Sequence, residues 1–199
     1  MGAMTKTQGR PRGFDRDAAL ERAMIEFWSR GYEATSIATL TSAMGINPPS
    51  LYAAFGDKRK LFHEAVERYA GTHGMVTVRA LAEEPVARDA MARLLREAAR
   101  VYSDPSHPPG CLVITAAVNV TSEEVKAELR EGRAASKRAF EQKIQADVDA
   151  GRLPPDTDAH ALATYYAAVV QGMSTQSCDG ATREELEQVA DLAMRAWPA

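Results

Sequence analysis

The most restrictive feature of the sequence is residues 35–55, which combine a short helical pattern with a tight turn. Thr35 or Ser36 supplies an N-cap, because a hydroxyl oxygen accepts a hydrogen bond from a free N–H group of the first helical turn. The pattern stops at Met44-Gly45-Ile46, where glycine permits a sharp change of direction. We therefore expect a short helix followed at once by a second one.

Three start signals for this second helix coincide. Asn47 can cap it, Pro48 suits its first position because no N–H group is needed there, and Ile46 can pack against Leu51. Gly56 ends the pattern. Two short helices joined by a glycine-containing turn match a helix-turn-helix, whose second helix presents its N-terminal residues to the major groove of DNA.

The rest of the chain also shows helical periodicity, and the sequence has no convincing alternating strand pattern. We expect an all-α fold of about nine helices. The first begins after Asp15 and stops at Gly31, and a fourth begins at Asp57. Further helices are expected over 86–102 and 111–119, from a Thr121/Glu124 capping box to Gly151, from Asp158 to about Gln176, and from Thr182 to about Trp197.

Length and charge suggest a small N-terminal unit and a larger body within the 199 residues. The first 62 residues hold nine Lys/Arg against six Asp/Glu, whereas the remainder holds fifteen against twenty-one. A basic front is expected where one end of a protein meets a polyanion. We predict a flexible basic arm at 1–13, a DNA-binding unit at 14–62, and an effector-binding and dimerisation unit at 63–199.

Several classes of protein are disfavoured. No apolar run approaches a membrane span, and two cysteines do not make a disulfide scaffold, so we expect a soluble protein of the cytoplasm. The four histidines lack metal-ligand spacing, and we expect no metal and no cofactor. No phosphate loop, nucleophile elbow or paired-carboxylate signature points to an enzyme.

The outward side of the second short helix carries the candidate DNA contacts. With Leu51 and Phe55 inward, the residues left facing out are Pro48, Pro49, Ser50, Tyr52 and Ala53. A plain three-helix bundle that binds nothing would show the same local signals. The basic residues that follow this helix favour a DNA-binding unit over such a bundle.

The next helix begins with Lys58, Arg59 and Lys60, where the helix dipole is already positive. The three positive charges repel one another and the positive end of the dipole. A phosphate group bound at that helix end would compensate this repulsion. A solvated run of charge is the alternative. Arg10 and Arg12 in the arm can reach phosphates or a narrow minor groove, and a solubilising tail explains that stretch equally well.

These residues together resemble the tetracycline-repressor (TetR) family across Phe14–Phe62. The matching residues are Ala23, Phe27, Gly31, Tyr32, Thr35, Ile37, Gly45, Ile46, Leu51, Tyr52, Phe55, Lys58 and Leu61. The resemblance implies that Thr35, Tyr52 and Lys58 contact phosphates while Pro48, Pro49 and Ser50 approach bases. It also implies an all-α ligand-binding body that forms a homodimer through its last two helices.

Two departures from the family pattern limit base recognition. Thr41 replaces a small apolar residue, and Ala53-Ala54 replace a polar or aromatic pair. With proline at positions 48 and 49, only Ser50 can hydrogen-bond a base edge. We expect specificity to depend on dimer spacing and DNA shape, and a footprint with many strictly required G·C positions would contradict this.

The body is less diagnostic. Apolar stripes on the last two helices can pair across a two-fold axis or pack only on their own body. The candidate dimer residues are Tyr165, Val169, Gly172, Leu186, Val189, Ala193 and Trp197. The candidate effector-pocket residues, each of which also suits an ordinary core, are Met75, Met91, Cys111, Phe140, Tyr166 and Met173.

The sequence therefore predicts a ligand-responsive repressor that binds palindromic double-stranded operator DNA as a homodimer and is released by a small molecule. An alternative is a regulator that senses oxidants or electrophiles through Cys111, which follows Pro108-Pro109-Gly110 at a short helix start. An inert buried cysteine suits the same position. An enzyme with Cys111 as nucleophile and a protein-interaction module are the other classes considered.

Overall fold

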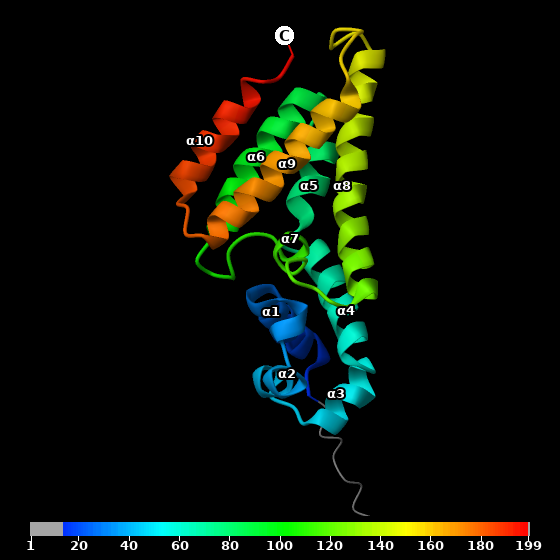
Figure 1. Ribbon diagram of the computed structural model, residues 1–199, viewed down its shortest axis with the longest axis vertical. Coiled ribbons are helices and arrows are strands. Elements are labelled where there is room, and N and C mark those ends of the chain that lie inside the picture. The colour runs from blue at the N-terminus through cyan, green and yellow to red at the C-terminus, as the bar shows by residue number, and fades with distance from the viewer. Residues whose placement is uncertain (1–13, 199) are drawn as a thin grey trace, which may run out of the picture.

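The computed structural model describes residues 14–198, and in this part of the chain helices are joined by loops and turns, without strands (Figure 1). The all-α prediction is confirmed. The elements, in chain order, are α1 Arg16–Ala34, α2 Ile37–Met44, α3 Pro48–Phe55, α4 Lys58–Ala70, α5 Met75–Glu83, α6 Ala87–Tyr102, α7 Leu112–Thr115, α8 Glu123–Asp149, α9 Ala159–Cys178 and α10 Arg183–Met194.

The first four helices begin where side-chain caps place them. Asp15 accepts a hydrogen bond from the Ala18 N–H, Ser36 from Thr39, Asn47 from Ser50 and Asp57 from Lys60. Each cap satisfies an N–H group that has no partner within its own helix. Helix starts in this part of the chain are therefore fixed locally.

The core of the N-terminal part contains an aromatic pair. Phe27 of α1 meets Phe62 of α4 edge to face, with ring centroids 5.0 Å apart, and both side chains are fully buried. Aromatic pairs of this geometry contribute about 0.5–1.5 kcal/mol beyond the area they bury. Leu40 and Leu51 complete the core from α2 and α3, so the two short helices are held by packing.

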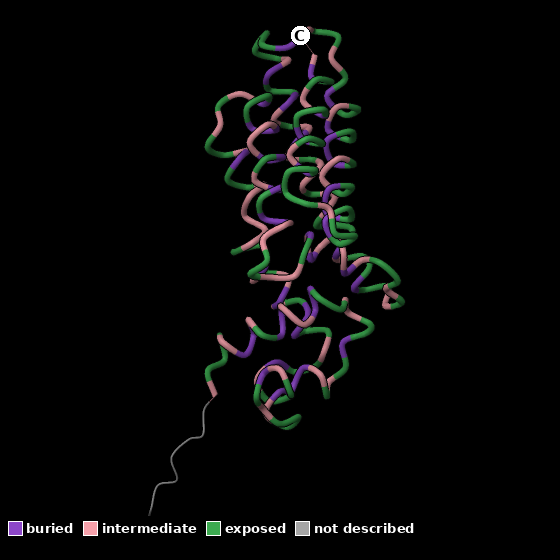
Figure 2. The backbone as a smooth tube through the Cα atoms, turned by 90° about the vertical axis from the view of Figure 1, so that its left-hand side faces the viewer, coloured by how far each residue is buried: buried purple, intermediate pink, exposed green. Residues whose placement is uncertain are grey.

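Helices α5, α6, α8, α9 and α10 form the body, a bundle whose buried residues belong to one hydrophobic core. Figure 2 colours the backbone by burial, and buried and exposed stretches alternate along the bundle. Asp147 on α8 is buried and accepts a hydrogen bond from the Ala87 N–H at the start of α6, which lacks a side-chain cap of its own. Arg152 donates two hydrogen bonds, of 2.9 and 2.7 Å, to the same carboxylate. One carboxylate thereby joins two helices.

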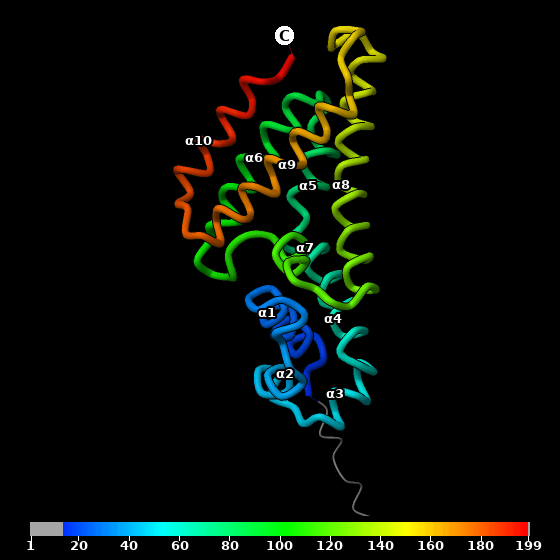
Figure 3. Tube along the Cα trace, viewed as in Figure 1, coloured from blue at the N-terminus to red at the C-terminus, as the bar shows by residue number. Residues whose placement is uncertain are grey.

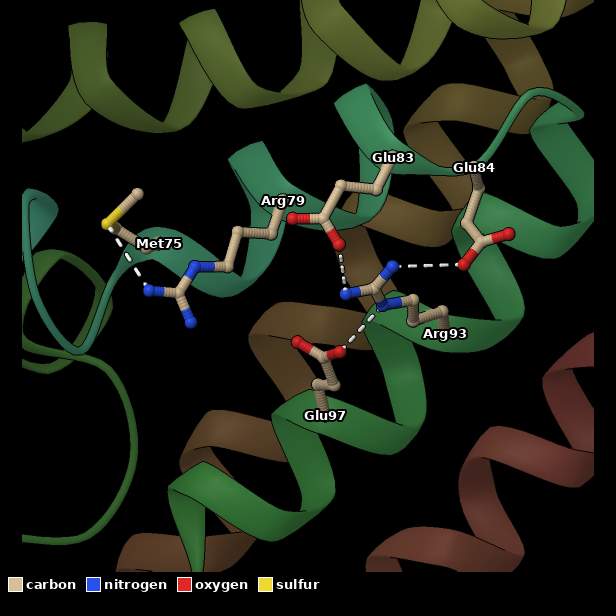
Figure 4. Close-up of polar contacts among 6 residues, drawn as sticks. All are labelled: Met75, Arg79, Glu83, Glu84, Arg93 and Glu97. Carbon is tan, nitrogen blue, oxygen red and sulfur yellow. Dashed lines mark hydrogen bonds and ion pairs between the residues drawn. The ribbon is translucent and has the colours of Figure 1, made fainter.

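Helix α5 is held against α6 by a charged network (Figure 4). Arg93 of α6 pairs with Glu83 and Glu84 at the end of α5 and with Glu97 one turn along α6, at 2.6, 3.0 and 2.7 Å. Helix α5 was not predicted from the sequence. Gly74, which precedes this helix, offers no side-chain cap, and Val78 is exposed in the structure.

The two parts of the chain meet around α4 and α7 (Figure 3). Helix α4 continues without a break through the boundary expected at residue 62. Leu112 of α7 and Leu129 of α8 pack into the same hydrophobic core as α1 and α4. The N-terminal part and the body therefore share buried surface.

One helix start and one helix length differ from the sequence prediction. Ser122, not Thr121, caps α8, because Thr121 instead donates its backbone N–H and its hydroxyl to Glu33 of α1. The expected helix 111–119 is a single turn, Leu112–Thr115, and Asn119 beyond it has a left-handed φ of 59°. Tertiary contacts decide both cases.

Candidate functional site

Helix α3 lies at the end of the molecule farthest from the body (Figure 1). Leu51 and Phe55 are buried, whereas Pro48 and Pro49 are exposed and the Tyr52 side chain is 50% exposed. Ser50 is half-buried, and its backbone N–H donates a hydrogen bond to Asn47. Its side-chain hydroxyl is therefore the group through which Ser50 can hydrogen-bond DNA. The outward side of α3 is therefore mostly apolar.

Thr35 does not fit its expected role. Its side chain is fully buried, and its hydroxyl donates a 2.6 Å hydrogen bond to the Gly31 carbonyl. Gly31 has a φ of 78° and breaks α1, so the threonine satisfies a carbonyl at this break. Ser36 is the exposed residue that caps α2, and Thr35 cannot reach a phosphate in this conformation.

The basic cluster at the start of α4 is partly neutralised. The Lys58 ammonium lies 4.2 Å from the centre of the Tyr32 ring, and Arg59 pairs with Glu124 of α8 at 3.0 Å. Burial lowers the pKa of Lys58, and Glu33 opposes this shift. Lys60 is exposed and has no ion pair within residues 14–198.

Arg10 and Arg12 lie outside the described residues. Arg16, at the start of α1, pairs with Glu64 of α4 at 2.7 Å and donates a hydrogen bond to the Ala54 carbonyl at the end of α3. Its guanidinium also lies 4.4 Å from the centre of the Phe55 ring. Arg16 therefore fixes α3 relative to α1 and α4.

A cavity of about 250 Å³ lies between α4, α5, α7, α8 and α9. Apolar side chains form most of its wall, together with Glu128 and Arg133 from α8. The lining residues are Val66, Tyr69, Ala70, Gly74, Val76, Thr77, Val78, Tyr102, Cys111, Val113, Ile114, Glu128, Gly132, Arg133, Ser136, Phe140, Ala167, Val170 and Gln171. An apolar wall with a few polar groups is typical of a small-molecule site.

Of the six pocket candidates, Cys111 and Phe140 line this cavity. Met91 does not, because it is fully buried in the core of α6, and Met173 is likewise buried in the body core. Tyr166 is buried and donates its hydroxyl to the Ala193 carbonyl of α10. Met75 lies at the first turn of α5, with its sulfur 3.9 Å from Arg79 (Figure 4).

Cys111 precedes α7, and its thiol lies among the hydroxyl groups of Tyr69 and Tyr102. Burial raises the pKa of the thiol, and hydrogen bonds from the two tyrosines and from backbone N–H groups of α7 lower it in part. The net effect keeps the sulfur protonated near neutral pH. The thiol therefore borders the cavity in its less nucleophilic form.

Sequence reasoning missed the charged part of the cavity wall. The apolar stripe of α8 consists of Val125, Leu129, Phe140 and Ile144, and Arg133 follows Leu129 by one turn on the same side. A basic residue within an apolar stripe could have indicated this part of the wall. Burying its charge is costly unless a partner compensates it.

The outer side of α9 and α10 holds only some of the expected dimer residues. Tyr165 and Val189 are 40% and 39% exposed, Gly172 is exposed and Val169 is half-buried. Three others do not fit, because they are buried within their own chain: Leu186, Ala193 and Trp197. Leu186 and Ala193 on α10, and Trp197 just beyond it, pack against the body.

Within residues 14–198 no group of histidine, cysteine and carboxylate side chains is arranged to hold a metal ion. None of the described helices is long and apolar enough to cross a membrane.

Comparisons with known proteins agree with this architecture. Residues 19–65 match the bacterial regulatory proteins of the tetR family, and residues 85–193 match the tetracyclin repressor-like C-terminal domain. The chain belongs to the TetR family. It is 35% identical to the HTH-type transcriptional repressor ComR of Escherichia coli K12, an alignment that covers 97% of this chain and 93% of ComR.

Two further relatives of this TetR-family chain extend the comparison. The HTH-type transcriptional repressor BdcR of Escherichia coli K12 is 32% identical, over 96% of this chain and 93% of BdcR. A solved structure of the TetR family regulator CifR, a cysteine-substituted form complexed with 26 bp of double-strand operator DNA, is 48% identical. It superposes with a TM-score of 0.91 and covers 96% of this chain and all of its own.

Proposed function

We propose that this TetR-family chain is a ligand-responsive repressor of the cytoplasm that binds palindromic operator DNA as a homodimer. A small-molecule effector bound in the body releases it from DNA, and it acts as a regulator rather than as an enzyme. In this proposal residues 1–13 are a basic arm, 14–62 bind DNA, and 63–199 bind the effector and dimerise. CifR, in its complex with operator DNA, supports the DNA-binding part of the proposal.

The observation that carries the proposal is the position of α4. Its first turn lies directly after α3, and its last turns place Val66, Tyr69 and Ala70 in the cavity wall. A ligand that prefers a different position of these residues shifts α4 and, through it, the spacing of the two α3 helices in the dimer. Successive major grooves require a spacing of about 34–36 Å, so a small shift weakens binding.

The DNA contacts in this proposal are Pro48, Pro49, Ser50 and Tyr52 on α3 and Lys58 on α4. Lys58 must leave the Tyr32 ring to reach a phosphate. Lys60, which is exposed at the same helix start, is a further phosphate contact. Because the exposed side of α3 is mostly apolar, we propose that DNA shape contributes much of the specificity.

Gel-shift titration with duplex DNA from upstream of the chain's own gene tests this proposal. The protein should bind, with an affinity that falls steeply as salt rises, because phosphate contacts release counterions. Tyr52→Ala should weaken binding by about ten-fold or more, by loss of roughly 1.5–3 kcal/mol. Val118→Ala, at another exposed position outside α3, is the control. Absent or salt-insensitive binding would refute the proposal.

A second candidate function is electrophile sensing through Cys111. The observation in its favour is that the thiol borders the cavity beside two tyrosine hydroxyls. An alkylating probe such as N-ethylmaleimide would then modify Cys111 and release DNA, and Cys111→Ser would abolish the release. If the probe modifies only Cys178, which is exposed, this candidate fails.

A further inference from the structure

The two charged residues in the cavity wall are in different electrostatic states. Glu128 accepts a 2.7 Å hydrogen bond from His63 of α4 and is thereby paired. Arg133 donates one hydrogen bond, of 3.0 Å, to the Val113 carbonyl of α7, and no carboxylate lies within 4.0 Å of it in the described chain. Glu128 is compensated, whereas Arg133 has no counter-ion.

The surroundings of Arg133 make this charge costly. Its side chain is half-buried, burial lowers its pKa, and the nearby charge of Arg130 lowers it further, against an opposing effect of Cys111. A guanidinium has five N–H donors, and the bond to Val113 uses one of them. A methionine or leucine would fill the same space without the cost of removing a charge from water. The bond to Val113 links α8 to α7, but it leaves the other N–H donors of Arg133 available for a ligand.

The rest of the wall limits the size and polarity of a partner for Arg133. The cavity, at about 250 Å³, lies below the usual range of about 300–1,000 Å³ for drug-sized ligands. Val113, Phe140 and Val170 provide an apolar surface near the charged residues. Because Glu128 is already paired with His63, Arg133 is the one uncompensated cation among the lining residues and can balance a single negative charge. These features together suit a small molecule with an apolar part and a single anionic group.

We propose that the effector is a small monocarboxylate, whose carboxylate pairs with Arg133 and whose apolar chain lies against Val113, Phe140 and Val170. The planar carboxylate matches the guanidinium fork and can accept two parallel hydrogen bonds. The inference rests on the proposed function, because it names the ligand class for the same cavity.

Thermal-shift and calorimetric titrations with straight-chain monocarboxylates of four to eight carbons test the inference, with the matched primary alcohols, amides and dicarboxylates as comparison ligands. At least one monocarboxylate should raise Tm in a concentration-dependent way. The matched alcohol and amide should bind about ten-fold or more weakly, because they lack the charge that Arg133 pairs with. The dicarboxylate should also bind more weakly, because its second carboxylate has no free cation in the cavity wall.

Two variants locate the effect. Arg133→Gln should weaken binding of the best monocarboxylate by about ten-fold or more, and Arg133→Lys, which keeps the charge but not the fork, should weaken it less. Arg138→Gln, at an exposed position of the same helix that does not line the cavity, is the matched control and should leave affinity unchanged. The Tm without ligand and the DNA affinity of each variant show whether it folds.

The outcomes separate the two proposals. If the wild-type chain binds promoter DNA but no monocarboxylate raises its Tm, or if the matched alcohol binds equally well, the ligand inference is wrong and the repressor function stands. Equal affinity in Arg133→Gln would also refute it. If the wild-type chain does not bind DNA at all, the proposed function fails, whatever ligand the cavity accepts.

Discussion

Trp28 occupies a position where a single side chain contacts both parts of the chain. Its ring stacks on His107 of the loop after α6, with centroids 4.6 Å apart, and lies 5.1 Å from His73, just beyond α4. The two histidine rings are 4.7 Å apart. The Trp28 Nε1 group is buried and is the one such side-chain polar atom without a hydrogen-bond partner among residues 14–198. This cluster tolerates neutral rings better than charged ones.

Acid should therefore loosen this contact. Burial lowers the pKa of His73 and the neighbouring His107 lowers it further, while Glu21 and Asp104 oppose the shift. Because the pKa is lower in the folded state, the unfolded chain binds protons more readily. Stability is therefore retained above the ordinary histidine pKa of about 6.5 and lost as pH falls through it. Urea unfolding at several pH values, followed by Trp28 fluorescence in a Trp197→Phe background, measures this.

The matched comparison uses the two histidines with opposite shifts. His73→Gln should reduce the loss of stability in acid. His63→Gln should act in the opposite sense, because hydrogen bonding to Glu128 raises the pKa of His63, so its stabilisation is present at low pH and lost as pH rises. Identical pH profiles for wild type and His73→Gln would contradict the assignment.

Asp147 gives a second test with one side chain. Asp147→Asn should lower the free energy of unfolding by about 1–3 kcal/mol, because the Ala87 N–H and Arg152 lose a charged acceptor in a buried place. Arg152→Gln is the comparison. Its side chain is half exposed, so its effect should stay within about 1 kcal/mol. Denaturant unfolding measures both, and equal losses would mean that the α6 cap contributes little.

At the scale of helices, local signals predict starts well and long-range contacts poorly. The caps at Asp15, Asn47 and Asp57 depend only on the residue three positions further along, and the structure confirms them. The expected start of the last helix at Thr182 is confirmed for the same reason, because Thr182 and Glu185 form a capping box. Thr121 failed as a cap because Glu33, distant in sequence, binds it.

The surface against which an apolar stripe packs could not be predicted from the sequence either. Leu186 and Trp197 form an apolar stripe whether they meet a second subunit or their own body, and only the folded chain shows that they pack on the latter. The cavity wall posed the same problem. Periodicity does not tell a residue that lines a cavity, such as Phe140, from one that fills a core, such as Met91.

The ion pairs of Arg93 allow a test of how α5 is held against α6. Arg93→Met should leave Glu83, Glu84 and Glu97 without their shared cation, so α5 should separate more easily from α6. We expect a lower Tm and faster amide hydrogen exchange in α5. Added salt should reduce the loss, because it screens the repulsion between the carboxylates.

The control for this change is Arg183→Met, which removes a single exposed pair with Glu187 within α10. One such pair contributes little to stability. Equal Tm changes in the two variants, or unchanged exchange in α5, would show that α5 is held by its apolar contacts alone.

At the scale of the molecule, the proposed regulation needs two copies of the chain. The proposed DNA-binding surface of one copy, α3, would occupy a single groove, so in this proposal affinity depends on a second copy at a fixed distance. The exposed small and apolar residues of α9 and α10, which include Tyr165, Gly172 and Val189, provide a side on which two copies can pack closely. Both copies must keep α4 in the same position.

Val189→Glu tests this arrangement. In a two-fold interface each copy contributes the same surface, so the new carboxylates would lie near each other and lose water on association. We expect monomers in sedimentation analysis and a loss of operator affinity of about ten-fold or more. Val118→Glu places the same substitution at a residue that is 68% exposed and lies outside α9 and α10. It should leave both properties unchanged, and a Val189→Glu protein that remains dimeric would place the interface elsewhere.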